Sequence, residues 1–208
     1  MPRRTIAIAA ALSVLALGSP LITGCTNPLA TQYFNQGVEK YEAGNYQGAI
    51  DDWSKAIEIN PQNAAAYYNR GDAKDNLGDD QGAIADYTKA IEINPQNVIA
   101  YYNRGVSKGN LEDYQGAISD YDKAIELDPQ NADAYNNRGV SKSYLEDYQG
   151  AISDYTKVIE INPQYASAYY NRGIARELVN DLAGACSDWR KAADFGLKEP
   201  AQWVKNQC

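Results

Sequence analysis

Residues 64–97 read AAAYYNRGDAKDNLGDDQGAIADYTKAIEINPQN, a segment that carries helix-capping residues, a helical apolar pattern and a proline. Asn63 directly precedes it and has a side chain suited to an N-cap, as does Asp79 midway through it. The apolar residues after Asp79 recur at helical spacings, at Ala83, Tyr87, Ala90 and Ile91. Pro95 cannot continue that helix. The segment therefore predicts two short helices joined by a turn.

The same residue types return every 34 residues along the chain. The repeated residues are a glycine (Gly37, Gly71, Gly105, Gly139 and Gly173), an alanine (Ala49, Ala83, Ala117, Ala151 and Ala185), an aromatic (Trp53, Tyr87, Tyr121, Tyr155 and Trp189) and a proline (Pro61, Pro95, Pro129 and Pro163). A fixed period of this length indicates stacked units, each of which buries its apolar face against its neighbours.

The pattern resembles the tetratricopeptide repeat, whose aromatic, glycine, alanine, aromatic and proline places are occupied here by Tyr67, Gly71, Ala83, Tyr87 and Pro95. The resemblance covers residues 30–197 and implies an all-α fold, a right-handed α-solenoid of five helix-turn-helix repeats with a C-terminal capping helix. The units are expected at residues 30–63, 64–97, 98–131, 132–165 and 166–197, and the capping helix at 198–208.

Charged residues also recur, which predicts a ladder of ion pairs. Arginines stand where the family usually has leucine, at Arg70, Arg104, Arg138 and Arg172. An aspartate precedes each second-helix aromatic, at Asp52, Asp86, Asp120, Asp154 and Asp188. These pairs could lie within one unit or between neighbouring units. As exposed pairs, each would stabilise the fold by about 0–1 kcal/mol.

The first 24 residues are predicted to be an export signal. Arg3 and Arg4 form a positive start, residues 5–17 are uncharged and mostly apolar, and Pro20 lies in the segment that ends this stretch. The apolar stretch is shorter than the roughly 20 residues that a transmembrane helix needs.

Residues 21–25, LITGC, resemble the lipobox of bacterial lipoproteins. This resemblance implies cleavage before Cys25, acylation of Cys25 and a short tether at residues 25–29. The repeats would then lie in the periplasm, anchored by lipid to a membrane of the cell envelope, with the outer membrane favoured. Cleavage after Gly18 is the alternative, and it would give a soluble periplasmic or secreted protein.

Cys186 and Cys208 remain once Cys25 is assigned to lipid. Two antiparallel helices about a turn at Gly196 would place them side by side, so we predict a disulfide. Two free buried thiols are the alternative.

Composition excludes several classes of site. The chain of 208 residues has no histidine and a formal net charge of −8, which argues against His-dependent catalysis and against nucleic-acid binding. No phosphate-binding glycine motif is present. Carboxylate pairs such as Asp51–Asp52 and Asp79–Asp80 could perform acid–base chemistry, but capping and ion pairing explain them better. We expect no enzyme activity, cofactor or metal.

The expected function is that of a scaffold that binds a protein or peptide segment in its concave groove. By the resemblance, the first helix of each unit lines this groove, whose predicted residues are Phe34, Tyr68, Asn69, Asp72, Tyr102, Asn103, Val106, Asn137, Val140, Tyr170 and Asn171. The tyrosines are assigned to a partner because the packing of the repeat and the ion pairs do not require them. The chain is expected to be a monomer, and a self-associating structural array is the alternative.

Overall fold

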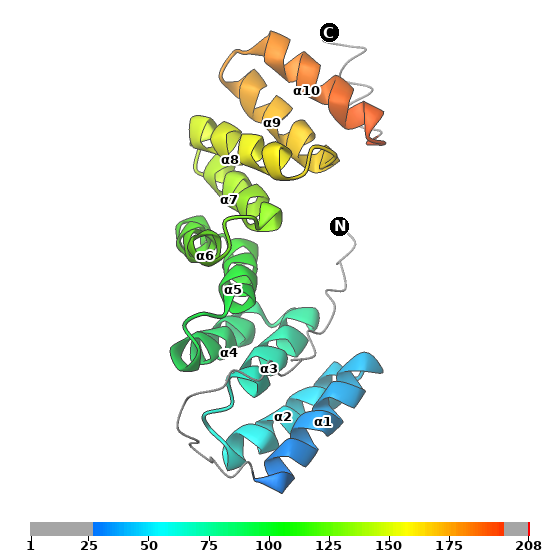
Figure 1. Ribbon diagram of the computed structural model, residues 1–208, viewed down its shortest axis with the longest axis vertical. Helices are drawn as coiled ribbons and strands as arrows, with labels where there is room; N and C mark the ends of the chain where they lie inside the picture. The colour runs from blue at the N-terminus through cyan, green and yellow to red at the C-terminus, as the bar shows by residue number, and fades with distance from the viewer. Residues whose placement is uncertain (1–26, 198–207) are drawn as a thin grey trace, which may run out of the picture.

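The computed structural model describes residues 27–197 and Cys208, and in this part of the chain all regular structure is helical. The first helix of each unit is α1 (Pro28–Glu42), α3 (Ala64–Asn76), α5 (Val98–Asn110), α7 (Ala132–Tyr144) or α9 (Ala166–Leu178). The second is α2 (Tyr46–Ile59), α4 (Asp80–Ile93), α6 (Tyr114–Leu127), α8 (Tyr148–Ile161) or α10 (Leu182–Asp194). Figure 1 shows these pairs stacked one after another into an elongated array.

The all-α solenoid of five helix pairs is confirmed. The predicted signal at 1–24 and nearly all of the predicted capping helix at 198–208 lie outside the described residues.

The helix starts follow the predicted caps. Asn63 accepts a hydrogen bond from the backbone N–H of Ala66 at 3.1 Å, and Asp79 accepts one from Gly82 at 2.9 Å. Each satisfies a backbone donor that the first turn of a helix leaves without a partner. The last unit departs from this pattern, because Tyr165 stands at the N-cap of α9 and makes no side-chain capping bond.

Within each unit the glycine of the first helix lies against the aromatic ring of the second. A Cβ atom added at Gly105 would lie 2.7 Å from Cε1 of Tyr121, a ring that is only 3% exposed. The alanines at the close contacts, such as Ala83 and Ala117, are fully buried. Small residues on one helix and a flat ring on the other therefore bring the two helices of a unit close together.

The first helices also contact one another between units: α3 with α5, α5 with α7, and α7 with α9. Among the described helices, second helices make no comparable contact with each other. First helices are therefore more closely spaced along the array and lie on its inner side, which is the side expected to bind a partner.

The ion pairs form within units and reach back to the preceding unit. Arg104 donates from Nε to Asp120 Oδ2 at 2.9 Å and from Nη2 to Oδ1 at 2.6 Å, and its Nη1 donates to Thr88 of the preceding unit at 3.0 Å. Lys108 adds a further contact to Asp120 at 2.8 Å. Arg70, Arg138 and Arg172 repeat the arrangement, with Ser54, Asp122 and Thr156 as their partners in the preceding unit.

These aspartates are buried, so an energy taken from exposed pairs is wrong for them. Asp120 is 2% exposed, and the Arg104 side chain is 16% exposed. Removal of one partner from such a pair leaves an uncompensated charge in a desolvated place, which costs several kcal/mol. The first unit, where Gln36 replaces the arginine, keeps its aspartate charged by another route. Burial acts to raise the pKa of Asp52, but hydrogen bonds from Lys40 and Lys55 outweigh it and hold that pKa below its ordinary value.

Candidate functional site

The predicted groove residues all lie on first helices and are all half-buried. Phe34 is on α1, Val106 is on α5 and Val140 is on α7. Phe34 packs against the buried cluster around Trp53, and Val140 against the cluster around Tyr155. The assignment of these residues to partner binding stays a prediction.

Two of the predicted groove tyrosines have a structural role. The ring of Tyr68 packs on Tyr87 of its own unit, with centroids 5.8 Å apart, and its hydroxyl accepts a hydrogen bond from Nδ2 of Asn103 at 3.1 Å. Tyr102 likewise packs on Tyr121 at 6.0 Å and accepts from Asn137 at 3.0 Å. We call these contacts inter-unit Tyr–Asn hydrogen bonds.

The premise that the packing of the repeat does not use these tyrosines is therefore wrong. Sequence spacing missed the contact because donor and acceptor are 35 residues apart on different units. The same contacts occupy the amides of Asn103 and Asn137, which are also predicted groove residues.

The first and fourth units lack this tyrosine, because Phe34 and Asn136 stand in its place. Asn136 is 9% exposed, and its Nδ2 donates to Oδ1 of Asn137 at 3.2 Å. Its own Oδ1 is buried and has no hydrogen-bond partner in the described part of the chain. Between units 1 and 2 the hydroxyl of Tyr41 instead donates to Asp72.

Charge is unevenly distributed over the first helices. Their basic residues form ion pairs with aspartates of the second helices: Lys40 with Asp52, Arg70 and Lys74 with Asp86, Arg104 and Lys108 with Asp120, Arg138 and Lys142 with Asp154, and Arg172 and Arg176 with Asp188. The carboxylates of Asp72 and Asp133, by contrast, bond to the hydroxyls of Tyr41 and Tyr165. Burial raises the pKa of Asp72, and the hydrogen bond from Tyr41 offsets part of that effect.

A hollow of about 170 Å³ lies between α5 and α7, lined by Ile99, Tyr102, Asn131 and Asp133. Ile99 is 40% exposed, and the carboxylate of Asp133 accepts from the Tyr165 hydroxyl at 2.6 Å. Sequence reasoning missed Ile99 and Asp133. Each lies three residues before the place of the groove tyrosine, almost one helical turn away, and this spacing would have placed both on the groove face.

A larger hollow of about 360 Å³, between α7 and α8, is lined by Tyr135, Arg138 and residues of α8. Arg138 is bonded there to Asp154 and to Asp122, and its guanidinium lies over the Tyr135 ring at 5.3 Å. The positive charge of Arg138 is therefore compensated by aspartates of the protein. The smaller hollow is the better candidate for a ligand.

The carboxylate pairs considered for acid–base chemistry have structural partners. Asp52 bonds to Lys40, and Asp79 caps α4. Asp80 accepts from Asn110 of the next unit at 2.8 Å. Within the described residues no group of three His, Cys, Asp or Glu side chains is arranged to hold a metal ion. None of the described helices has the length and apolar character needed to cross a membrane.

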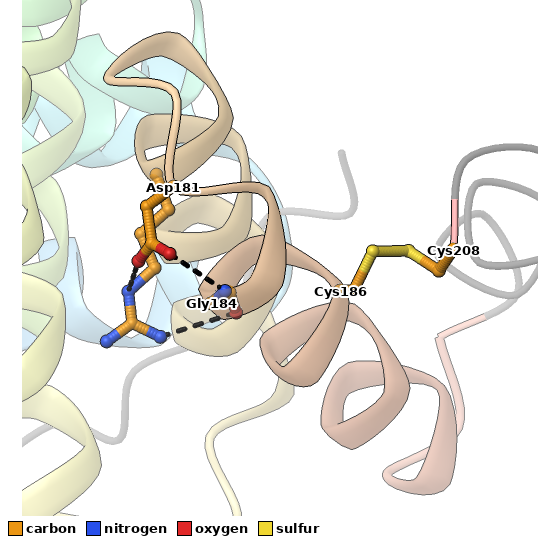
Figure 2. The surroundings of a disulfide bond; sticks show 5 residues. Asp181, Gly184, Cys186 and Cys208 are labelled. Atoms are coloured by element: carbon orange, nitrogen blue, oxygen red, sulfur yellow. Dashed lines mark hydrogen bonds and ion pairs between the residues drawn. A yellow bond between two sulfur atoms is a disulfide. The ribbon is translucent and has the colours of Figure 1, made fainter.

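The last unit carries a disulfide between Cys186 on α10 and Cys208, with Cα atoms 5.7 Å apart (Figure 2). The same helix begins at Asp181, whose carboxylate caps it by accepting from Gly184 at 3.0 Å. Arg176 of α9 contacts both Asp181 and the Gly184 carbonyl, which ties α9 to the start of α10.

The stacked helix pairs, with their inner surface of first helices, define a helical-repeat scaffold. A family model described as TPR repeat matches residues 37–78. A second model, described as tetratricopeptide repeat, matches residues 64–97, 98–131 and 132–165. The chain belongs to the tetratricopeptide repeat family. The resemblance to this repeat is confirmed, whereas the lipobox resemblance stays a prediction.

Solved structures support the same fold. A crystal structure of MamA protein is 27% identical over 84% of this chain and 95% of its own, with a TM-score of 0.78. MamA from Desulfovibrio magneticus RS-1 is 20% identical over 86% of this chain and 99% of its own, with a TM-score of 0.79. YrrB, described as a TPR protein with an unusual peptide-binding site, is 24% identical over 85% of this chain and 91% of its own, with a TM-score of 0.77. No curated protein matches the sequence.

Proposed function

We propose that this protein is a lipid-anchored scaffold of the bacterial cell envelope that binds a peptide or protein segment on the inner surface of its repeats. The hollow between α5 and α7 carries the binding part of the proposal, because it combines apolar walls with a polar rim on the inner face. YrrB shares only the fold at this level of identity, so its peptide-binding site serves as a precedent for the architecture.

The groove includes Tyr102 in a double role. Its ring packs on Tyr121, and it also lines the hollow. Tyr102→Ala would therefore lower both the melting temperature and the affinity for a partner, so it cannot separate packing from binding. Ile99 provides a better probe, because it lines the hollow, is 40% exposed and takes no part in the inter-unit Tyr–Asn hydrogen bonds.

A photo-crosslinking amino acid at Ile99 tests the groove in cells that express the full-length protein. The matched control carries the same amino acid at Ser119, an exposed residue of the second helix α6. We expect a discrete crosslinked product from position 99 and none from position 119. Equal crosslinking from both positions, or crosslinking from 119 alone, would place the partner elsewhere.

The anchor part of the proposal rests on the signal and lipobox resemblance of residues 1–25. Two or three acyl chains hold a protein at a membrane far better than one. Full-length protein should fractionate with membranes, and Cys25→Ser should abolish this or leave the signal uncleaved. Cys186→Ser, which removes a different cysteine, should remain membrane-bound. A wild-type protein found free in the periplasm would contradict the anchor without affecting the groove.

A further inference from the structure

The charges of the inner surface define the chemistry of the segment that fits it, and this inference rests on the proposed peptide-binding function. The basic residues of the first helices are paired with buried aspartates of the second helices, such as Asp86 and Asp120. These cations are therefore held away from a ligand. Asp72 and Asp133 remain on first helices with hydroxyl partners that leave their negative charge uncompensated.

The residues that line the hollow between α5 and α7 suit a long basic side chain. Ile99 and Tyr102 supply apolar and aromatic walls, and Asp133 supplies a carboxylate at the same hollow. Lysine and arginine bury their methylene stems along apolar surface while the charged end reaches a polar group. An aromatic ring beside the stem adds favourable contact with the cation.

The charged group at this hollow is the Asp133 carboxylate, and Asn131, whose Oδ1 accepts from the backbone N–H of Ala134, adds a neutral amide. The Asp133 carboxylate receives one hydroxyl and can accept further bonds. A cationic side chain complements this carboxylate better than a neutral or acidic one does, because its hydrogen bond to Asp133 is charge-assisted.

We propose that the groove selects a basic peptide segment, and that a lysine or arginine side chain of this segment lies along Ile99 and Tyr102 with its charge on Asp133. On the neighbouring first helix α3, Asp72 lies four residues after Tyr68 and so on the same face of that helix, where it provides a second negative charge. The segment therefore carries more than one basic residue.

The test uses full-length protein and an array of random-sequence 12-residue peptides. Bound peptides should be enriched in lysine and arginine. A bound basic peptide and its copy with glutamine in place of each basic residue should then differ in affinity by at least about tenfold, because the basic peptide makes charge-assisted hydrogen bonds. Binding of the basic peptide should weaken as salt is raised.

Asp133→Asn assigns the effect to the hollow. It keeps an acceptor for Tyr165 but removes the charge, and it should reduce the affinity for the basic peptide by about tenfold while leaving the glutamine peptide unaffected. Asp51→Asn, the same change at an exposed position of α2, should alter neither affinity. Peptides that bind without enrichment in basic residues, or an Asp133→Asn protein that binds normally, would overturn this inference and leave the proposed function standing. An array that binds no peptide would overturn the proposed function itself.

Discussion

Arg104 and Asp120, on the two helices of the third unit, meet through two parallel hydrogen bonds of 2.9 and 2.6 Å, and the carboxylate is almost fully buried. The same guanidinium donates to Thr88 of the preceding unit and lies over the ring of Tyr101, 5.6 Å from its centroid. One arginine thus joins the helices of its own unit and the seam to the unit before it.

Asp120→Ala should lower the free energy of unfolding by about 3–5 kcal/mol, because it leaves Arg104 and Lys108 without their buried counter-charge. Glu126→Gln breaks the exposed pair with Lys123 and should leave stability nearly unchanged. Urea unfolding of both variants measures the difference. Equal effects would show that burial does not determine the strength of these pairs.

Two glycines of α5 should respond in opposite ways to alanine. A Cβ at Gly105 would lie 2.7 Å from the buried Tyr121 ring, so Gly105→Ala should destabilise the protein by about 1–3 kcal/mol. A Cβ at Gly109 meets nothing within 4 Å, so Gly109→Ala should stabilise it by about 0.5–1 kcal/mol through helix propensity. Thermal unfolding should show Tm shifts of opposite sign, and a shared sign would contradict the close approach at Gly105.

Tyr68→Phe should lower the free energy of unfolding by about 0.5–1.5 kcal/mol, because Asn103 loses its acceptor while the ring and its packing remain. The neighbouring Tyr67→Phe is the control. The Tyr67 ring lies under Arg70 at 5.6 Å, a contact that phenylalanine retains, so its effect should stay within about 0.5 kcal/mol. Urea unfolding that gives the same free energy for both variants would show that the inter-unit hydrogen bond adds nothing to stability.

The half-buried carboxyl group of Asp72 should make the stability of the protein depend on pH. Burial raises the pKa of Asp72, so the folded protein binds this proton more tightly than the unfolded chain does. Stability associated with Asp72 is therefore greatest below the unfolded pKa of about 3.9 and is lost as pH rises through the folded pKa. Asp72→Asn should accordingly stabilise the protein at pH 7, with an advantage that disappears near pH 3.

The control for this pH dependence is Asp51→Asn, which removes an exposed charge and should have little effect at either pH. Thermal unfolding across this pH range measures both variants. An Asp72→Asn protein that is less stable than wild type at pH 7 would contradict the predicted direction of this pH dependence.

Loss of the disulfide should weaken the last unit. The bond joins two residues that are 22 apart in sequence. A cross-link of this length lowers the entropy of the unfolded chain and so stabilises the fold by about 3 kcal/mol. Hydrogen exchange in Cys186→Ser should speed up in α9 and α10 and stay unchanged in α3 to α6, because repeats couple mainly to their neighbours. Peptide mapping without reductant should recover the two cysteine peptides joined. Two freely alkylated cysteines would rule the bond out.

Local rules explain the features that could be predicted from the sequence. The 34-residue period gives the number of units, and the caps Asn63 and Asp79 give the helix starts. Each of these depends on residues of one unit and on the fixed geometry of a helix, so spacing along the chain is sufficient to predict it.

The contacts between units could not be predicted in this way. The recurring Arg and Asp were visible in the sequence, but only the stacking places Arg104 between Asp120 and Thr88 and buries the carboxylate. It also directs Asn137 to Tyr102, and it brings Ile99 and Asp133 together in one hollow. These contacts depend on the angle and distance between successive units. That geometry follows from the packing of whole helix faces, which spacing along one chain does not specify.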